Sequence, residues 1–90
     1  MRLEFKSEAE EDLARIFEFN SQRSERLAHR VEDRILNRCE ALPRTPYVGR
    51  PHQDPGVRRL SVPDIQYVID YELADDLVVI MRIRHTREIR

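Results

Sequence analysis

Cysteine, glycine and tryptophan are scarce in this chain of 90 residues, which contains one Cys, two Gly and no Trp. Because Cys39 is alone, neither an intramolecular disulfide nor a cysteine-rich metal site can form. The two glycines, Gly49 and Gly56, open no helix, so the sequence has no phosphate-binding loop. The three histidines lie far apart and match no metal-ligand motif. We therefore expect neither a metal nor a cofactor.

Long apolar stretches are also missing. No apolar run approaches the ~20 residues of a transmembrane helix, and no secretory leader opens the chain. We therefore expect a cytoplasmic protein that does not enter a membrane. The length allows one domain, residues 1–90. A domain this small buries only about 60% of its unfolded surface, so a protein partner would add substantially to its stability.

Charged residues are abundant but nearly balanced, with 16 basic and 17 acidic side chains and a net charge of −1. The total charge therefore gives no reason to expect nucleic-acid binding. The distribution is uneven, because basic segments 43–62 and 77–90 alternate with acidic segments 1–20 and 63–76. All basic residues except Lys6 are arginines. This bias reflects either the composition of the genome or selection for the forked guanidinium group, which binds carboxylates and phosphates.

The first half of the chain predicts a short strand and two amphipathic helices. Residues 2–6 alternate as in a strand, after which Ser7 and Glu10 predict a capping box for a helix that ends near residue 20. A second helix is predicted from about 24 to 41, and the short link makes the pair an antiparallel hairpin. Glu and Arg alternate on its outer faces, where pairs one turn apart would make an ordinary solvated surface. Its apolar stripe comprises Leu27, Val31, Ile35, Cys39 and Leu42.

The second half predicts a β-meander. Residues 43–56 hold four of the five prolines and both glycines, which indicates a rigid, irregular loop. Segments 57–62, 66–73 and 77–85 then alternate in polarity and are separated by short turns, as in a three-stranded antiparallel meander. The whole order predicts an α+β fold: an N-terminal strand, a two-helix hairpin and the meander, with the helices on one face of the sheet.

The last predicted strand becomes basic toward its end. Its apolar side, with Val79, Met81 and Ile83, should face the helices. That orientation would make Arg82 and Arg84 project from the open face of the sheet. Antiparallel sheets often keep one face in water, so this pattern requires no function by itself.

Cleavage of RNA by general acid–base chemistry is the reaction that these residues best supply. It needs a group that transfers protons and cations that stabilise the charged phosphorane. His85 would be the first, because histidine ordinarily titrates near neutral pH. Arg59 and Arg82 would supply the charge, with Arg84 and Arg87 beside them. The simpler interpretation, which composition alone favours, is that His85 marks the end of a strand next to an exposed basic tail.

Five segments follow one another in a family-like order. They are "SEAEEDL" after the opening strand, "PYVGRP", "GVRRLSV", "YVIDYEL" and "VVIMRIRH". In order and spacing they resemble the ParE branch of the ParE/RelE toxin superfamily over nearly the whole chain. The most family-like stretches are Gly49-Arg50-Pro51, Arg58-Arg59-Leu60, Tyr67-Val68-Ile69 and Arg84-His85.

The resemblance implies a toxin of a type II toxin–antitoxin system, a class associated with plasmid stabilisation. ParE-like members inhibit DNA gyrase and are neutralised by a ParD-type antitoxin. They form a hetero-oligomer with it and meet operator DNA only through it. RelE-like relatives cleave mRNA on the ribosome, usually with basic residues and a C-terminal Tyr or His. Arg59, Arg82 and His85 would correspond to such a set.

This chain has no Tyr near its end and no lysine beyond Lys6. These departures favour a gyrase inhibitor without catalytic residues. An mRNA endonuclease remains the main alternative, and a relative that only forms interactions remains the third.

Two docking surfaces are expected. Candidate antitoxin anchors are Leu13, Phe17 and Phe19, which would meet an amphipathic segment. Phe19 is the best candidate for an exposed contact, because it falls outside the main apolar stripe. The target would meet the basic end of the chain, at Arg82, Arg84, His85, Arg87 and Arg90.

Overall fold

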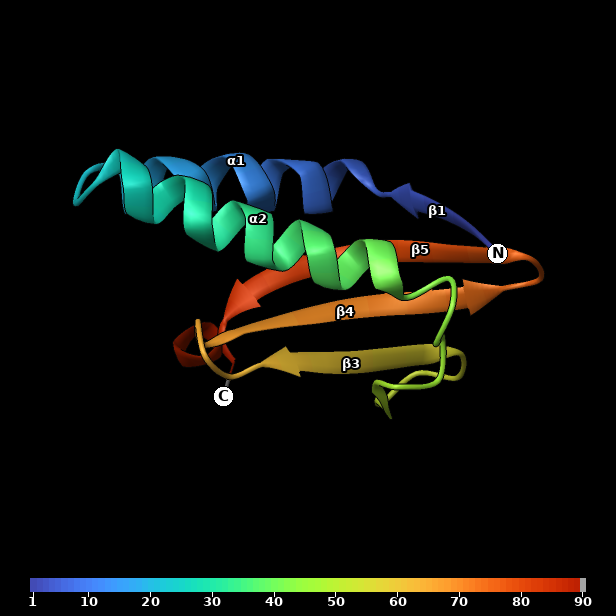
Figure 1. Cartoon of the computed structure of the whole chain (residues 1–90). Helices are drawn as coiled ribbons and strands as arrows, with labels where there is room; N and C mark the ends of the chain where they lie inside the picture. Colours follow the sequence, from blue (N-terminus) through green and yellow to red (C-terminus); the bar gives the residue numbers. More distant parts are fainter. Residues whose placement is uncertain (90) are drawn as a thin grey trace.

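The computed structural model describes residues 1–89 as a five-stranded sheet with a helix hairpin on one face (Figure 1). The α+β class and the order of the main elements agree with the prediction. The elements are β1 (Arg2–Phe5), α1 (Ser7–Ser21), α2 (Glu25–Ala41), β2 (Arg50–Pro51), β3 (Val57–Val62), β4 (Tyr67–Ala74), β5 (Leu77–His85) and the 3₁₀ helix η1 (Thr86–Glu88).

The strand order is β1-β5-β4-β3-β2, and β1 is the one strand that pairs in parallel. A parallel neighbour requires a long crossover, and the helix hairpin provides it above the sheet (Figure 1). β1 pairs with β5 only from Leu77 to Ile80. The edge of β5 beyond residue 80 therefore lies next to α1 rather than next to a strand.

The side of β5 that faces the helices differs from the prediction. Val78, Ile80 and Ile83 are fully buried, so placing Val79 and Met81 on that side was wrong. The cause is a bulge at residue 81 in the pairing with β4. One extra residue reverses which side of a strand meets the core.

The start of α1 also differs from the prediction. Ser7 makes no capping bond; its hydroxyl lies 3.2 Å from the carboxylate of Glu8. The N-cap is Lys6, whose amide still donates to the carbonyl of Ile80 in β5 at 2.9 Å. Strand pairing therefore fixes where the helix begins. Ser24 caps α2 by accepting from the Leu27 amide, close to where the sequence predicted that this helix begins.

The core lies between the hairpin and the sheet. Its fully buried members from the two layers include Ile35, Cys39, Leu42, Ile69, Tyr71 and Ile80. Tyr71 also anchors the loop before β3, since its hydroxyl donates to the Pro46 carbonyl at 2.7 Å and accepts from the Gly49 amide at 2.9 Å. A Cβ at Gly49 would lie 2.7 Å from that hydroxyl, so the close approach requires glycine.

Candidate functional site

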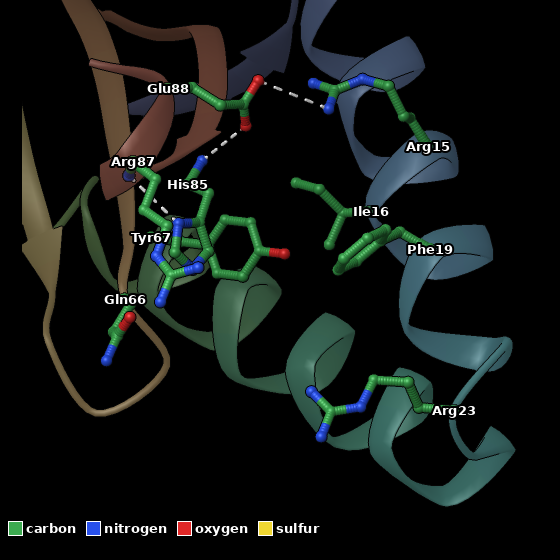
Figure 2. Close-up of a pocket in the computed structure, with 9 residues that line it drawn as sticks. All are labelled: Arg15, Ile16, Phe19, Arg23, Gln66, Tyr67, His85, Arg87 and Glu88. Carbon is green, nitrogen blue, oxygen red and sulfur yellow. Dashed lines mark hydrogen bonds and ion pairs between the residues drawn. The ribbon is translucent and has the colours of Figure 1, made fainter. Parts of the chain in front are cut away.

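A hollow of about 580 Å³ opens where the second half of α1 meets the end of β5 and the start of β4 (Figure 2). Its apolar part consists of Ile16, Phe19 and Tyr67, and the Phe19 side chain is 60% exposed. The other lining residues are polar or charged: Arg15, Arg23, Gln66, His85, Arg87 and Glu88. The hollow therefore offers an accessible aromatic surface surrounded by guanidinium groups.

His85 lies at the rim of this hollow and caps η1. Its Nδ1 accepts the amide proton of Arg87 at 3.1 Å, while its own amide donates to the carboxylate of Glu88 at 2.9 Å. The His85 ring packs edge-on against Tyr67, with 5.1 Å between ring centroids. Glu88 also pairs with Arg15 at 3.6 Å, which ties η1 to α1. Since Nδ1 is occupied, Nε2 is the nitrogen left for any other partner.

Asp12 joins α1 to β5. Its side chain is 5% exposed and accepts hydrogen bonds from Arg82 at 2.8 and 3.2 Å, from Arg15 at 2.9 Å and from the Ile83 amide at 2.9 Å. The Ile83 amide belongs to the edge that β1 leaves unpaired, so Asp12 satisfies it in place of a strand. Burial disfavours the charged carboxylate, but these donors outweigh burial and lower the pKa of Asp12 below its ordinary value.

Asp70 organises a second arginine cluster, on the face of the sheet away from the helices. Arg59 binds its carboxylate in a bidentate manner at 2.6 and 2.9 Å, and Arg84 donates at 3.1 Å. Burial again opposes ionisation, but the hydrogen bonds and charges of Arg59 and Arg84 lower the pKa of Asp70. Asp70 also stands in register with Arg82 on β5, but Arg82 binds Asp12 instead.

Arg59, Arg82 and His85, the residues that the ribonuclease alternative would use, are therefore not gathered as free groups. The two arginines bind two different buried carboxylates, and the histidine caps a turn. The positive charge that a phosphorane would need is already compensated at both arginines.

The four arginines proposed to bind the target together with His85 fall into three groups. Arg82 was expected to project from the open face but pairs with α1, because Asp12 lies within its reach; Arg84 lies on that face but pairs with Asp70. Arg87 is exposed and forms no ion pair within residues 1–89. Arg90 lies outside the described residues.

The three candidate antitoxin anchors occupy different environments. Leu13 packs against the core, and Phe17 is half-buried with its ring 5.0 Å from that of His29. Phe19 alone of the three is exposed, in the hollow. Its contact with an antitoxin remains a prediction.

Sequence reasoning did not find the two aspartates that position these arginines. Asp12 follows Ala9 and precedes Ile16 and Asn20 at helical spacing, and all four are buried. That spacing was available in the sequence, but Asp12 was hidden within an acidic cluster. Asp70 gave no such signal, because its partners come from two other strands.

The part of the chain that the structure describes, residues 1–89, contains no group of three His, Cys, Asp or Glu side chains placed to hold a metal ion. No helix in this range is long and apolar enough to cross a membrane. Burial raises the pKa of Cys39 to about 12, so its thiol is a core group rather than a nucleophile.

Comparison with known proteins gives one family. The model for the ParE toxin of the type II toxin–antitoxin system parDE matches residues 3–90. No curated protein matches the sequence.

Several solved structures share the fold, among them the following three. The chromosomal ParDE toxin–antitoxin system from P. aeruginosa matches with a TM-score of 0.85 and 23% identity, over 94% of this chain and 95% of that chain. The isolated RelE toxin of E. coli matches with a TM-score of 0.71 and 12% identity, over 93% and 82%. The toxin–antitoxin complex RelBE2 from Mycobacterium tuberculosis matches with a TM-score of 0.69 and 23% identity, over 93% and 88%. At these identities the likeness establishes the fold.

Proposed function

This chain belongs to the ParE toxin family of type II toxin–antitoxin systems, and we propose that it inhibits DNA gyrase and is neutralised by a ParD-type antitoxin. The expectation of gyrase as the target comes from the ParE branch. The RelE likeness keeps mRNA cleavage as the competing activity, since one fold supports both. The ion pairs that hold Arg59 and Arg82 favour gyrase inhibition over mRNA cleavage.

The main support for this proposal is that Arg59 and Arg82 form ion pairs with buried carboxylates. Asp70 and Asp12, with side chains 9% and 5% exposed, hold them through two hydrogen bonds each. A catalytic arginine must offer its charge to the transition state. An arginine that already binds a desolvated carboxylate offers little, and releasing it would leave that carboxylate buried without a partner. We therefore infer that the toxin acts by docking rather than by cleavage.

These ion pairs reduce the number of arginines that can contact the target directly. Arg82 and Arg84 stabilise the fold through Asp12 and Asp70, so their contribution to docking is indirect. Within residues 82–89, Arg87 is the exposed arginine, and the His85 cap holds its backbone in place. We propose that Arg87 makes the principal charged contact with gyrase or with the DNA that gyrase holds.

The hollow around Phe19 is the proposed antitoxin site. Both ParDE and RelBE2 are toxin–antitoxin systems by name, and this fold leaves Phe19 uncovered at the end of α1. An amphipathic helix laid in such a groove would bury the ring. The guanidinium group of Arg23, which lines the same hollow, favours acidic side chains beside the apolar anchors of that helix.

The test uses the purified full-length toxin in two assays. We expect inhibition of gyrase supercoiling of relaxed plasmid, with the mRNA on translating ribosomes left intact. An mRNA endonuclease would give the opposite pattern, and the observation that favours it is that His85 and Arg87 line the same hollow. In that case His85→Ala would abolish transcript cleavage. Cleavage without gyrase inhibition contradicts the proposal. If the toxin neither inhibits gyrase nor cleaves mRNA, the result indicates a relative that only forms interactions.

A further inference from the structure

Four arginines recur at four-residue intervals along α2. They are Arg26, Arg30, Arg34 and Arg38. At 1.5 Å per residue, neighbouring members stand about 6 Å apart and the row is about 18 Å long. Because each four-residue step exceeds one turn by about 40°, the row turns by about 120° from Arg26 to Arg38 and stays on one flank, within one half of the helix circumference.

This row is unfavourable for the isolated helix. Three successive pairs of like charge stand four residues apart, and such pairs destabilise a helix. The acids of α2 do not relieve them, since no ion pair forms between two α2 side chains within residues 1–89. Arg34 pairs instead with Asp64 in the turn before β4, at 2.9 and 3.2 Å. The expectation of Glu–Arg pairs on a solvated face is therefore not met.

The flank is an open, continuous surface. Two hollows of about 470 and 260 Å³ follow it and share Arg30, Asp64 and Ile65. Asp33 lines the larger one, and Arg23 extends the smaller one toward the hollow at Phe19. The charged residues that line the two hollows are mostly arginines, since Asp33 and Asp64 stand against Arg23, Arg26, Arg30 and Arg34. Positive charge therefore dominates here on a chain whose net charge is −1.

A regular polyanion fits this surface. Each strand of double-helical DNA carries one phosphate per about 3.4 Å of axis, so about 18 Å of axis holds about five phosphates, of which the winding backbone turns a few toward a straight helix. Guanidinium forks bind phosphate oxygens in a bidentate manner. A rigid helix presents these guanidinium groups at a fixed spacing.

We propose that this arginine flank of α2 binds the phosphate backbone of double-stranded DNA without regard to sequence. The contact goes beyond the proposed function, because it requires neither gyrase nor an antitoxin. Asp64 reduces the number of phosphate contacts, because its carboxylate already binds the guanidinium group of Arg34.

The first test measures binding of the full-length toxin to a labelled duplex of about 25 base pairs by fluorescence anisotropy. Because Arg34 is held by Asp64, three phosphate contacts predict an affinity loss of roughly 40-fold between about 50 and 200 mM salt. The double variant Arg26→Gln, Arg30→Gln should make the slope of log K against log salt shallower by about 2. The matched control, Arg2→Gln with Arg50→Gln, removes two exposed arginines elsewhere and should leave the slope unchanged. Circular dichroism should show all variants folded.

The second test is a gain of binding. Asp64→Asn frees Arg34 and should steepen the salt slope by about 1. Asp54→Asn adds the same charge in the loop before β3 and should not change the slope.

Equal slopes for the α2 variant and its control would overturn the proposal, as would absence of duplex binding by the wild type. The proposal also fails if poly-glutamate binds the flank while DNA does not, or if the flank drives salt-sensitive self-association in sedimentation without DNA binding. Gyrase inhibition that persists in Arg26→Gln, Arg30→Gln would leave the proposed function standing while this contact is lost.

Discussion

The arginines of this protein differ in availability because Asp12 and Asp70 occupy some of them. Four arginines bind these two carboxylates. Two of them, Arg82 and Arg84, had been predicted to contact the target. Arg87 and the arginines of α2 other than Arg34 have no such ion pair within residues 1–89. The positive charge that this toxin offers to partners therefore depends on which guanidinium groups pair with a buried carboxylate.

Phe19→Ala tests the antitoxin site at the residue scale. If the ring anchors a ParD-type helix, truncation should weaken binding by about 2 kcal/mol or more, the range of an interface hot spot. Tyr47→Ala is the matched control, because Tyr47 is an exposed aromatic outside the hollow, with 72% of its surface accessible. Titration calorimetry with the cognate antitoxin measures both, and equal affinities would place the antitoxin elsewhere.

At the scale of elements, the shortness of β1 determines the site. β1 pairs with four residues of β5, and α1 covers the rest of that edge through Asp12. The bulge at residue 81 then turns Ile83 into the core and brings His85 opposite Tyr67. η1 closes the end of the sheet through its contacts with His85 and Arg15.

Deleting residues 86–90 tests the role of this closing turn. The shortened chain should remain folded, because its core and all five strands persist, with a Tm lowered by only several degrees. It should lose most gyrase inhibition, since Arg87 is removed. Supercoiling assays and thermal unfolding monitored by circular dichroism measure the two effects. Full inhibition by the shortened chain would show that the basic end is not the effector surface.

For the whole molecule, two ionised and buried carboxylates link stability to pH. Folding lowers the pKa of both Asp12 and Asp70 from 3.8. The unfolded chain therefore takes up these protons first as the pH falls. Their contribution is fully present above about pH 4 and is lost as the pH falls toward the folded-state pKa values.

Urea denaturation at several pH values tests this dependence. The free energy of unfolding should be flat near neutral pH and fall below about pH 4. Asp12→Asn should lower it by about 1–3 kcal/mol at neutral pH, because charged hydrogen bonds are lost. That difference should shrink in acid, where the wild-type carboxylate is protonated too. Glu11→Gln, an exposed change on the same helix, should have little effect; an Asp12→Asn difference independent of pH would point to packing rather than charge.

Local signals in the sequence determined the elements and the family. Alternation gave the strands, helical spacing gave the hairpin, and Ser24 marked the start of α2. These patterns depend on residues close together in the chain, so they can be read without coordinates. The ordered segments that resemble ParE identified the family for the same reason.

The tertiary structure decided which charges are free. The pairing of Arg82 with Asp12 spans 70 residues, and that of Arg59 with Asp70 depends on the register of two strands. The bulge in β5 arises only in the pairing with β4, so alternation within the strand predicted the wrong buried side. A sequence lists its guanidinium groups, but only the packed chain brings a buried carboxylate within hydrogen-bond distance and leaves the remaining arginines to bind partners.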